Sequence, residues 1–407
     1  MNQNNSPSQL TVTLPRGTLD LTYQSNPNLD NRYDIADLLD FAQRINPKRA
    51  FLFVSKVLGR HIPVAPSVMR RAFSELAGLI PDGLPEPILV IGMAETAVGL
   101  SAGVHQMLQS RYPNALLLNS TRHALADPDA KLLTTFSEDH SHASHHLIYQ
   151  SDDEHIQQAI LNTRTLIMVD DEASTGNTCK NVVHALQAAG LNQLEQVHLA
   201  TLVDWSLDSG AEIQDAKGIQ FFRQHLLAGS WQWSDAPNPE AITMPSLDTT
   251  AAGSEPVLPT GNWGRQPTFD SASGLGNYLA NFWDRFSRKF GESSELPKRI
   301  LVLGSNEFVW LPFLLAEHLE QQTSLQDSEH RVCFSALTRS PIAMGCAISE
   351  MLSFRDNYGL GMTNFVYNVA PSAWDLIVLC IETPNDSVDA LWQDLDNVLI
   401  VSPEPSF

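Results

Sequence analysis

The sequence predicts an α/β protein with two largely parallel sheets, one in each half of the chain. Short apolar runs alternate with segments of helical spacing, a pattern typical of parallel strands joined by helices. The chain has 407 residues, enough for two or three domains, and 43% of them are hydrophobic, which is sufficient for extensive cores. No apolar run is long enough to cross a bilayer and the N-terminus lacks signal-peptide features, so we expect a cytoplasmic protein.

Charge and cysteine content narrow the possible functions. The net charge of −21 argues against a surface that binds the nucleic-acid backbone, because such surfaces need clustered Lys and Arg. A small anionic ligand is still compatible, held by backbone N–H groups, a few arginines and a magnesium ion. The four cysteines, Cys179, Cys333, Cys346 and Cys380, show no CxxC pair, so we expect reduced thiols and no metal centre.

Composition divides the chain into four parts. Residues 1–30 are polar and rich in Asn, Ser and Pro, which predicts a segment that is at best partly ordered. Residues 31–233 form the first α/β domain, and residues 263–407 form the second. Between them, residues 234–262 are rich in Pro, Ser, Thr, Ala and Gly and are interpreted as a linker or a long surface loop.

Apolar runs mark the expected strands of both domains. In the first domain they are residues 50–55, 88–92, 115–119, 146–150, 165–169 and 197–203. In the second domain they are residues 299–303, 332–336, 375–381 and 398–401.

Three stretches of the first half align with three of the second half in the same order. They are 88–95 with 300–307, 119–122 with 336–339, and 166–172 with 376–382. Two interpretations fit: an internal duplication, or the strand-then-glycine pattern that recurs in any α/β chain. If there was a duplication, the second half is a degenerate copy, because Cys380 and Ile381 replace Asp170 and Asp171.

The most informative stretch is TLIMVDDEASTGNT, residues 165–178. An expected buried strand ends at Asp170 and Asp171, and a small polar loop then leads into a helix starting near Cys179. Free N–H groups at a helix start bind phosphate, and glycine lets the backbone approach closely. Carboxylates accept hydrogen bonds from a ribose diol. The stretch therefore predicts a ribose 5-phosphate site, the alternative being an ordinary capped helix after a strand.

This stretch resembles the phosphoribosyl pyrophosphate motif of type I phosphoribosyltransferases: an apolar strand, two acidic residues, and a loop ending in Thr-Gly-x-Thr. It departs from the motif at Glu172 and Ala173, where the family has larger apolar residues. The resemblance implies that Asp170 and Asp171 are catalytic. It implies that the substrate-binding loop is Ser174, Thr175, Gly176, Asn177 and Thr178. It also implies Mg2+ as cofactor, held by substrate oxygens and water with no dedicated protein site.

Two further segments take positions that the family uses for pyrophosphate. In residues 92–99, the resemblance implies substrate binding by Ala94, Glu95 and Thr96. Glu95 is unexpected beside an anion, so it would act through magnesium or orient the loop; the alternative is a plain strand–helix turn. Arg122 follows the next strand and fits the family's basic pyrophosphate ligand, with a surface arginine as the alternative.

The mobile loop and the acceptor-binding hood of the family also have counterparts. Residues 124–147 stand where the mobile loop lies, and His140 and His142 are candidates for proton transfer or pyrophosphate contact. A metal site, or a polar loop without a role, are the alternatives. Lys56 and Arg60 follow an expected strand where the hood is built, and we expect contact with a phosphate or an acidic acceptor, or else a basic surface turn.

Residues 338–341, TRSP, resemble the signature of the TRSP domain, which lies C-terminal to a distinctive phosphoribosyltransferase domain. The combined resemblance covers the chain from about residue 30. It implies a bacterial enzyme of tellurium-resistance (ter) stress-response gene clusters, where such proteins are predicted to help make a nucleoside-like metabolite. If the second half is a degenerate copy, we expect it to pack like a dimer mate and to lend Arg339 to a shared cleft.

The expected function is therefore transfer of ribose 5-phosphate from phosphoribosyl pyrophosphate to a nitrogenous base or related acceptor, with release of pyrophosphate. The expected partners are these small molecules, with a second copy of the chain or other stress-operon proteins as further candidates, and neither nucleic acid nor membrane. Two alternatives stand beside the enzyme: a non-catalytic nucleotide sensor with the same fold, and a structural partner in a stress complex.

Overall fold

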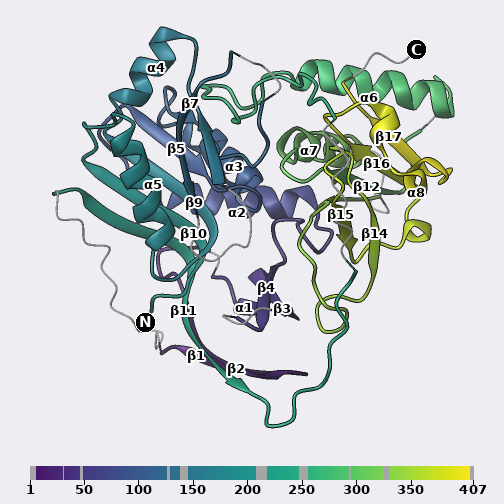
Figure 1. Ribbon diagram of the computed structural model, residues 1–407, viewed down its shortest axis with the longest axis horizontal. Helices are drawn as coiled ribbons and strands as arrows, with labels where there is room; N and C mark the ends of the chain where they lie inside the picture. The colour runs from purple at the N-terminus through teal and green to yellow at the C-terminus, as the bar shows by residue number, and fades with distance from the viewer. Residues whose placement is uncertain are drawn as a thin grey trace.

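Two sheets, one in each half of the chain, form the framework of the molecule (Figure 1). The computed structural model describes residues 6–30, 32–45, 49–125, 129–137, 145–207, 218–246, 255–292, 295–324 and 330–403. The first sheet and its helices form one lobe, and the second sheet and its helices form another lobe beside it. The predicted α/β fold with parallel sheets is confirmed.

The first sheet has seven strands in the order β1-β2-β11-β10-β9-β5-β6. Its strands are β1 (Ser8–Leu14), β2 (Gly17–Ser25), β5 (Ile88–Gly92), β6 (Leu116–Leu117), β9 (Thr165–Ala173), β10 (Gln196–Asp204) and β11 (Gln220–Asp235). The strands from β11 to β6 run parallel, whereas β2 is antiparallel to β11 and to β1. Because β9 is central, the carboxyl ends of its parallel neighbours gather around residues 170–173.

The second sheet has four parallel strands in the order β13-β12-β16-β17. Its strands are β12 (Arg299–Gly304), β13 (Arg331–Ala336), β16 (Leu376–Cys380) and β17 (Val398–Val401). In chain order, both β13-β12-β16-β17 and β6-β5-β9-β10 read second, first, third, fourth. The two halves therefore share strand order as well as the aligned stretches of sequence.

Three two-stranded ribbons complete the β-structure. They are β3 (Leu39–Gln43) with β4 (Phe51–Ser55), β7 (Leu132–Ser137) with β8 (His145–Tyr149), and β14 (Met351–Arg355) with β15 (Thr363–Tyr367). The last two ribbons occupy equivalent places: β7–β8 follows β6 in the first lobe, and β14–β15 follows β13 in the second. The backbone of Thr121 pairs with Leu147 in the first lobe, and Thr338 pairs with Phe365 in the second.

The helices cover the sheets and fill the space between the lobes. They are α1 (Ile35–Leu38), α2 (Pro66–Gly78), α3 (Val98–Leu108), α4 (Glu154–Leu161), α5 (Asn177–Ala188), α6 (Leu275–Phe290), α7 (Trp310–Ser324) and α8 (Ala390–Gln393), with 3-10 turns at Pro371–Ala373 and Asn385–Ser387. In the parts of the chain described above, no helix is long and apolar enough to span a membrane.

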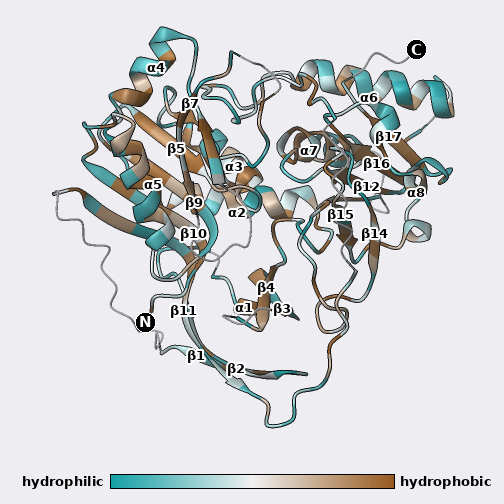
Figure 2. Ribbon diagram, viewed as in Figure 1, coloured by the Kyte–Doolittle hydropathy of each residue, from teal (hydrophilic) through white to brown (hydrophobic). Residues whose placement is uncertain are grey.

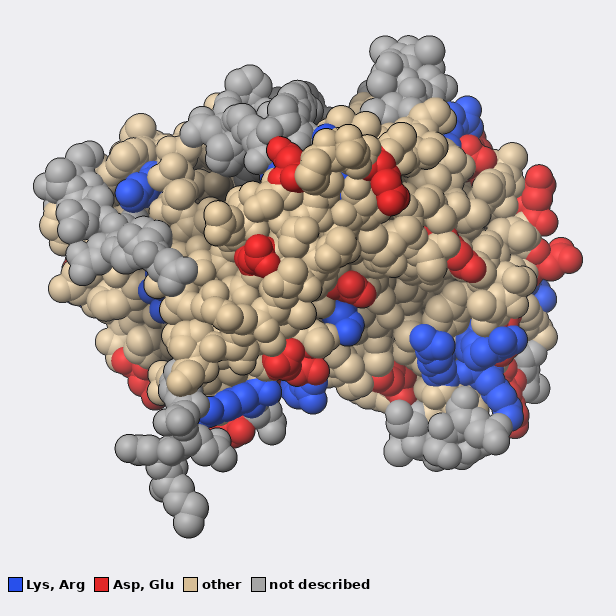
Figure 3. Space-filling model, turned by 90° about the horizontal axis from the view of Figure 1, so that it is seen from below, with Lys and Arg blue, Asp and Glu red and all other residues tan. Residues whose placement is uncertain are grey.

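One hydrophobic core runs through both lobes, which joins them into a single packed unit. Phe73 of α2 packs edge-on against Phe313 of α7, with ring centroids 5.4 Å apart, and Trp310 lies fully buried beside them. Apolar residues concentrate in the inner strands and in the helix faces turned toward them (Figure 2). The surface is mixed instead, and acidic and basic side chains are interspersed on the face in Figure 3.

The N-terminal segment corrects the sequence interpretation. Residues 1–30 were expected to be at best partly ordered, yet β1 and β2 lie within them and extend the first sheet. The cause is an alternating pattern: Leu19, Leu21 and Tyr23 of β2 face the core, and β2 pairs with β11 about two hundred residues away. Composition alone does not reveal such a long-range partner.

Two strand predictions also need correction. The run at 146–150 is part of the β7–β8 ribbon and not of a main sheet. The strand expected to end at residue 169 continues to Ala173, because its ladder with β10 runs on to the Ala173–Asp204 pair. The acidic pair therefore lies within the strand and not in the loop after it.

The segment between the lobes carries no helix or strand in its described parts, 236–246 and 255–262. It nevertheless follows the second lobe closely. The Leu258 N–H donates to the Glu382 carbonyl at 2.7 Å, and the Glu255 N–H donates to the Tyr358 carbonyl at 2.8 Å. The boundaries proposed at 233/234 and 262/263 stay predictions, and β11 runs two residues past the first of them to Asp235.

Candidate active site

A cavity of about 530 Å³ lies at the carboxyl end of β9. Its walls come from residues 170–179, at the end of β9 and in the loop that follows it, and from the β3–β4 ribbon. Residues 93–96 after β5 and Thr338 and Ser340 of the second lobe complete them. Open α/β sheets bind ligands at this edge, since helix N-termini and strand-end loops converge there. Most of the predicted site residues line this cavity.

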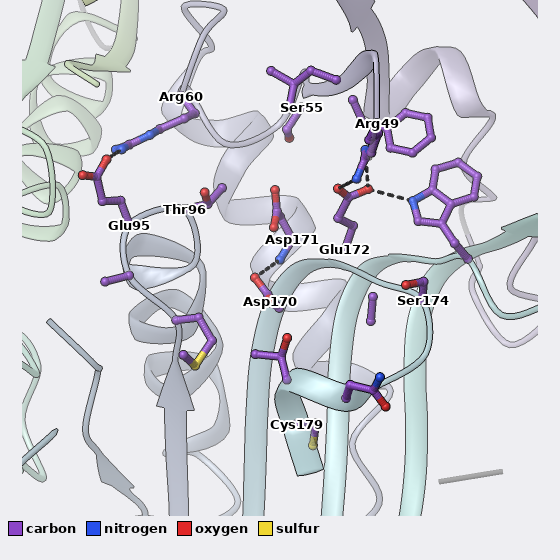
Figure 4. Close-up of a pocket in the computed structure, with 18 of the residues that line it drawn as sticks. Arg49, Ser55, Arg60, Glu95, Thr96, Asp170, Asp171, Glu172, Ser174 and Cys179 are labelled. Atoms are coloured by element: carbon purple, nitrogen blue, oxygen red, sulfur yellow. Dashed lines mark hydrogen bonds and ion pairs between the residues drawn. The ribbon is translucent and has the colours of Figure 1, made fainter. Parts of the chain in front are cut away.

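Asp170 and Asp171 lie at the centre of the cavity wall (Figure 4). The Asp171 N–H donates to Asp170 Oδ1 at 2.9 Å, which holds the two residues together. Burial, and then the adjacent charge of Glu172, raise the pKa of Asp171 to about 6. A buried carboxylate with a raised pKa at a cavity wall is a candidate partner for hydroxyls or a cation.

The loop after β9 leads into the start of α5. Ser174 and Thr175 are exposed beside the cavity, and Gly176 takes φ 74°, a conformation that favours glycine. The N-cap of α5 is Gly176, which has no side chain to cap the first turn; the helix begins at Asn177 and includes Thr178. The Asn177 N–H donates to Thr175 Oγ1 at 3.3 Å, and an anion at the helix start can accept from the N–H groups that follow it in the first turn. The helix begins two residues earlier than predicted.

The loop after β5 brings Ala94, Glu95 and Thr96 to the cavity. The Ala94 N–H donates to Ser120 Oγ at 3.0 Å, which ties this loop to the strand end beside it. The Glu95 carboxylate forms a buried ion pair with Arg60 and lies 3.7 Å from Arg339 Nε. Burial opposes its ionisation, but the charges of Arg60, Arg339 and Arg122 outweigh burial and hold the pKa of Glu95 below its usual value.

The predicted basic residues divide into three groups. Arg60 lines the cavity but is bound to Glu95, and it donates to the Asn306 carbonyl of the second lobe at 2.7 Å. Lys56 does not line the cavity: its Nζ donates to the carbonyl of Ala36 in α1 at 2.5 Å. Arg339 stands behind the cavity wall and reaches it through Glu95. The expectation that Lys56 and Arg339 bind ligand directly finds no support in this geometry.

Arg122 is the basic residue left for the ligand. Its side chain lines the cavity, and its buried Nε has no hydrogen-bond partner among the described residues. Its backbone N–H donates to Glu307 Oε1 of the second lobe at 2.7 Å. A guanidinium that lines a cavity favours an anionic ligand there.

The contacts between the lobes are reciprocal. Glu95 follows β5 of the first sheet and approaches Arg339, which follows β13 of the second sheet. Glu307 holds the corresponding place in the second lobe and accepts from Thr121 Oγ1 at 2.5 Å and from the N–H of Arg122. The same elements thus meet in both directions across the interface, as in a twofold pair.

The second lobe differs from the first at the place of the acidic pair. Cys380 and Ile381 are fully buried where the first lobe has Asp170 and Asp171. Glu382, aligned with Glu172, is fully buried and accepts two hydrogen bonds from Arg265, at 2.8 and 2.9 Å. This position serves packing and interface contacts.

The predicted histidines His140 and His142 lie outside the described residues. The described part of the β7–β8 ribbon contributes His146, whose Nδ1 lies 2.9 Å from Ser120 Oγ and whose ring stacks on Phe136 at 4.8 Å. Burial lowers the pKa of His146 to about 4, so the ring is neutral at pH 7. It supports Ser120, which in turn holds the Ala94 loop.

Among the cavity residues that were not singled out in the sequence, three surround Glu172 or lie beside it. Arg49 binds the Glu172 carboxylate at 2.7 Å, Trp205 Nε1 donates to it at 2.8 Å, and Arg44 lines the same end. The departure of Glu172 from the family motif was the available signal. A charged residue at an apolar position needs a partner, and the nearby RINPKR segment, residues 44–49, supplies it.

The donor set fits magnesium only with help from a substrate. Mg2+ prefers oxygen ligands in an octahedral arrangement, and the carboxylates of Asp170 and Asp171 offer such oxygens to the cavity. Within the described ranges no group of three or more His, Cys, Asp or Glu side chains is arranged to hold a metal. A cation beside Asp171 would favour its ionised form, whose pKa is raised first by burial and then by the charge of Glu172.

Comparisons with known proteins identify both halves. A family model described as phosphoribosyl transferase, PRTase_2, matches residues 38–229. A second, described as TRSP domain C terminus to PRTase_2, matches residues 278–399. No curated protein matches the sequence.

Several solved structures match part of this chain. Adenine phosphoribosyl transferase from Trypanosoma brucei, in complex with AMP, pyrophosphate and ribose-5-phosphate, is 12% identical, with a TM-score of 0.32 over 54% of this chain and 86% of that one. Adenine phosphoribosyltransferase from Rhodothermus marinus is 14% identical, with a TM-score of 0.30 over 47% and 95%. A hypoxanthine phosphoribosyltransferase from Staphylococcus aureus is 14% identical, with a TM-score of 0.23 over 41% and 78%. With both family models matched in order along the chain, this protein belongs to the family in which a phosphoribosyl transferase domain is followed by a TRSP domain.

Proposed function

We propose that the protein transfers ribose 5-phosphate from phosphoribosyl pyrophosphate to a nitrogen of a base or related acceptor and releases pyrophosphate. One observation carries the proposal: a single cavity joins the Asp170–Asp171 pair to the uncapped start of α5 on one side and to the Ala94–Thr96 loop on the other. These parts match the three parts of the donor, namely a diol, a 5-phosphate and a pyrophosphate.

The 5-phosphate binds at the α5 start. The N–H groups of the first turn and the hydroxyls of Ser174, Thr175 and Thr178 donate to its oxygens. The αL conformation of Gly176 turns the chain so that these donors converge. Asp170 and Asp171 then accept hydrogen bonds from the ribose hydroxyls.

Pyrophosphate leaves on the side of the Ala94 loop and Arg122. The transition state resembles an oxocarbenium ion with a departing anion, so rate acceleration comes from positioning and from fixed positive groups near the leaving oxygens. Arg122 supplies that charge, and Glu95 keeps the loop in place through Arg60 and Arg339. When bound, magnesium would be held by Asp170, Asp171 and substrate oxygens and would neutralise charge on the leaving group.

The second lobe acts as a built-in dimer mate in this proposal. Support comes from the shared strand order and from the reciprocal Glu95–Arg339 and Glu307–Arg122 contacts. We further propose a role in making a nucleoside-like metabolite in a bacterial stress response, which rests on the family resemblance. A cytoplasmic location stays a prediction.

The first test is pyrophosphate release from phosphoribosyl pyrophosphate and magnesium with a panel of nitrogen heterocycles. We expect release that depends on one class of acceptor and that is lost in Asp170→Asn/Asp171→Asn. The matched control is Asp152→Asn/Asp153→Asn, an adjacent acidic pair outside the cavity. Undiminished release in the Asp170/Asp171 variant would remove the pair from the mechanism. Binding of the donor without release by any acceptor would favour a sensor.

A further inference from the structure

We call the end of the cavity that is lined by Arg44, Arg49, Phe53, Glu172 and Trp205 the hood end. It contains two cationic side chains and one anionic side chain. Glu172 provides one carboxylate, and Arg49 binds it with two nitrogens, at 2.7 and 3.3 Å. Trp205 Nε1 also donates to it, at 2.8 Å. Arg49 and Trp205 thus engage both oxygens of this carboxylate, so it compensates a second cation only in part.

Arg44 is that second cation. It is half-buried, lines the same cavity, and donates from Nε to the Arg49 carbonyl at 3.3 Å. Among the residues that the structure describes, no carboxylate lies within ion-pairing distance of it. Burial and the charge of Arg49 lower the pKa of Arg44, and Glu172 offsets this only in part. A partly desolvated guanidinium without an anion is costly unless a ligand supplies one.

The walls beside these arginines are flat and aromatic. Phe53 and Trp205 are stacked with ring centroids 4.3 Å apart and planes at 17°. The Arg49 guanidinium lies over the Phe53 ring at 4.6 Å, which helps to hold this ring in place. Both aromatic residues line the cavity, as does Trp231. Such walls suit a planar ligand.

The position of this end relative to the donor site defines what binds there. In Figure 4 the Arg60–Glu95 pair lies on one side of Asp170 and Asp171, and the Arg49–Glu172 pair lies on the other. The first side carries the proposed pyrophosphate loop. The Arg49–Glu172 side adjoins the ribose directly, because Glu172 follows Asp171 in β9. A ligand at the hood end thus faces the ribose from the side opposite the leaving group.

We infer that the acceptor is a planar nitrogen heterocycle bearing a carboxylate or an equivalent anionic group, which Arg44 binds while the ring lies against Phe53 and Trp205. This inference rests on the proposed transfer function. The lone pair of a ring nitrogen forms the new C–N bond to ribose C1. The C1–O bond breaks, its electron pair leaves with pyrophosphate, and any proton on that nitrogen is released to water. A neutral acceptor would leave Arg44 uncompensated.

The test compares acid and neutral members of matched pairs, orotate with uracil and nicotinate with nicotinamide, with adenine and hypoxanthine as neutral purines. Each is assayed by pyrophosphate release in the presence of phosphoribosyl pyrophosphate and magnesium. We expect at least one acid to exceed its neutral partner in kcat/KM by roughly 10- to 100-fold, the range for one hydrogen-bonded ion pair. Faster turnover of the neutral member in both pairs would overturn the inference.

Variants of Arg44 assign the preference to this residue. Arg44→Ala should raise KM for the acid acceptor roughly tenfold or more while leaving KM for phosphoribosyl pyrophosphate unchanged, and Arg44→Lys should restore part of the loss. Arg164→Ala is the control, because Arg164 is exposed and pairs with Glu195 away from the cavity. An unchanged acceptor KM in Arg44→Ala, with its thermal melting temperature preserved, contradicts the assignment.

Calorimetry separates this inference from the proposed transfer. The same pairs are titrated into the protein with saturating pyrophosphate, a measurement that needs no turnover. Tighter binding of the acids, lost in Arg44→Ala, supports the anion site even if no pyrophosphate is released, and then only the transfer function fails. Equal binding of acid and neutral members overturns the anion site even if transfer occurs.

Discussion

Arg339 Nε, in the second lobe, lies 3.7 Å from the carboxylate of Glu95, in the strand–helix loop of the first lobe. The same guanidinium contacts His123 Nε2 at 2.7 Å, and Glu95 is also bound to Arg60. The loop that faces the proposed pyrophosphate is thus held by a residue that lies about 240 positions away in the sequence. This relationship makes Arg339 part of the site although its side chain does not line the cavity.

Removing Arg339 should impair use of the donor. Arg339→Ala leaves the buried Glu95 with one cation fewer, so the loop loses its fixed position and KM for phosphoribosyl pyrophosphate should rise roughly tenfold, with a smaller change in acceptor KM. Steady-state pyrophosphate release measures both. Arg339→Lys should recover part of the effect. Arg331→Ala, an exposed position on the same lobe, is the control, and equal kinetics in the two Ala variants would refute the positioning role.

The acidic pair should make donor binding depend on pH. The pKa of Asp171 is raised to about 6, so its carboxylate is available above pH 6 and protonated below it. Calorimetric affinity for phosphoribosyl pyrophosphate should fall by up to about tenfold per pH unit below 6. Asp171→Asn should bind more weakly and without this dependence. A wild-type affinity that is flat between pH 5 and 7 would contradict the prediction.

The same shift has a consequence for stability of opposite sign. The folded state retains the Asp171 proton between pH 3.8 and about 6, whereas the unfolded state has lost it, so this group lowers stability as pH rises through that window. At pH 7, Asp171→Asn should therefore increase the free energy of unfolding by on the order of 3 kcal/mol. Urea unfolding at pH 7 and at pH 4 measures this. The gain should shrink at pH 4, and a loss at pH 7 would show that the carboxylate is structurally required.

Gly176 allows a direct test of the phosphate loop. Its φ of 74° costs an alanine about 1–2 kcal/mol, so Gly176→Ala should destabilise the fold and raise KM for the donor. Gly78→Ala is the matched control, since a Cβ there meets no atom within 4 Å and φ is not positive. Unfolding curves and donor KM are compared for both variants. Equal donor KM in the two would argue against a phosphate at this loop.

The Arg49–Glu172 pair can be measured by a double-mutant cycle. Both side chains are partly exposed, 20% and 25%, so we expect a coupling energy of about 1 kcal/mol in urea unfolding. Glu172→Gln alone should lower the free energy of unfolding by more than this coupling energy, because the Glu172 carboxylate also accepts a hydrogen bond from Trp205. Additive effects of Arg49→Gln and Glu172→Gln would mean that the pair makes no net contribution.

Local sequence was sufficient to predict those parts of the candidate site whose residues lie on one continuous segment. An apolar run followed by Asp170, Asp171 and a loop with Gly176 predicts a strand and then a helix start. This is possible because backbone preferences and hydrophobic periodicity depend on residues only a few positions apart. The strand-end position of Arg122 is local in the same way. The duplication hypothesis gains support from the shared strand order, since each half repeats the local pattern.

Contacts between distant segments had no such signal. Lys56 and Arg60 are near neighbours in the sequence, yet Arg60 is buried against Glu95 while Lys56 donates to Ala36 in the hood. The segment before β3 carried no hint that β2 pairs with β11. In each case the partner is set by packing across the core.

Residues 165–178 thus predicted a ligand class from chain order alone, because strand, acidic pair and loop act through neighbours. Which charges face that ligand was settled by folding. Packing of the two lobes engages Glu95 with Arg60 and Arg339, whereas docking of the hood ribbon engages Glu172 with Arg49 and leaves Arg44 uncompensated. The physical reason is that a buried charge is governed by whichever partner lies within a few ångströms, however far away it is in the sequence.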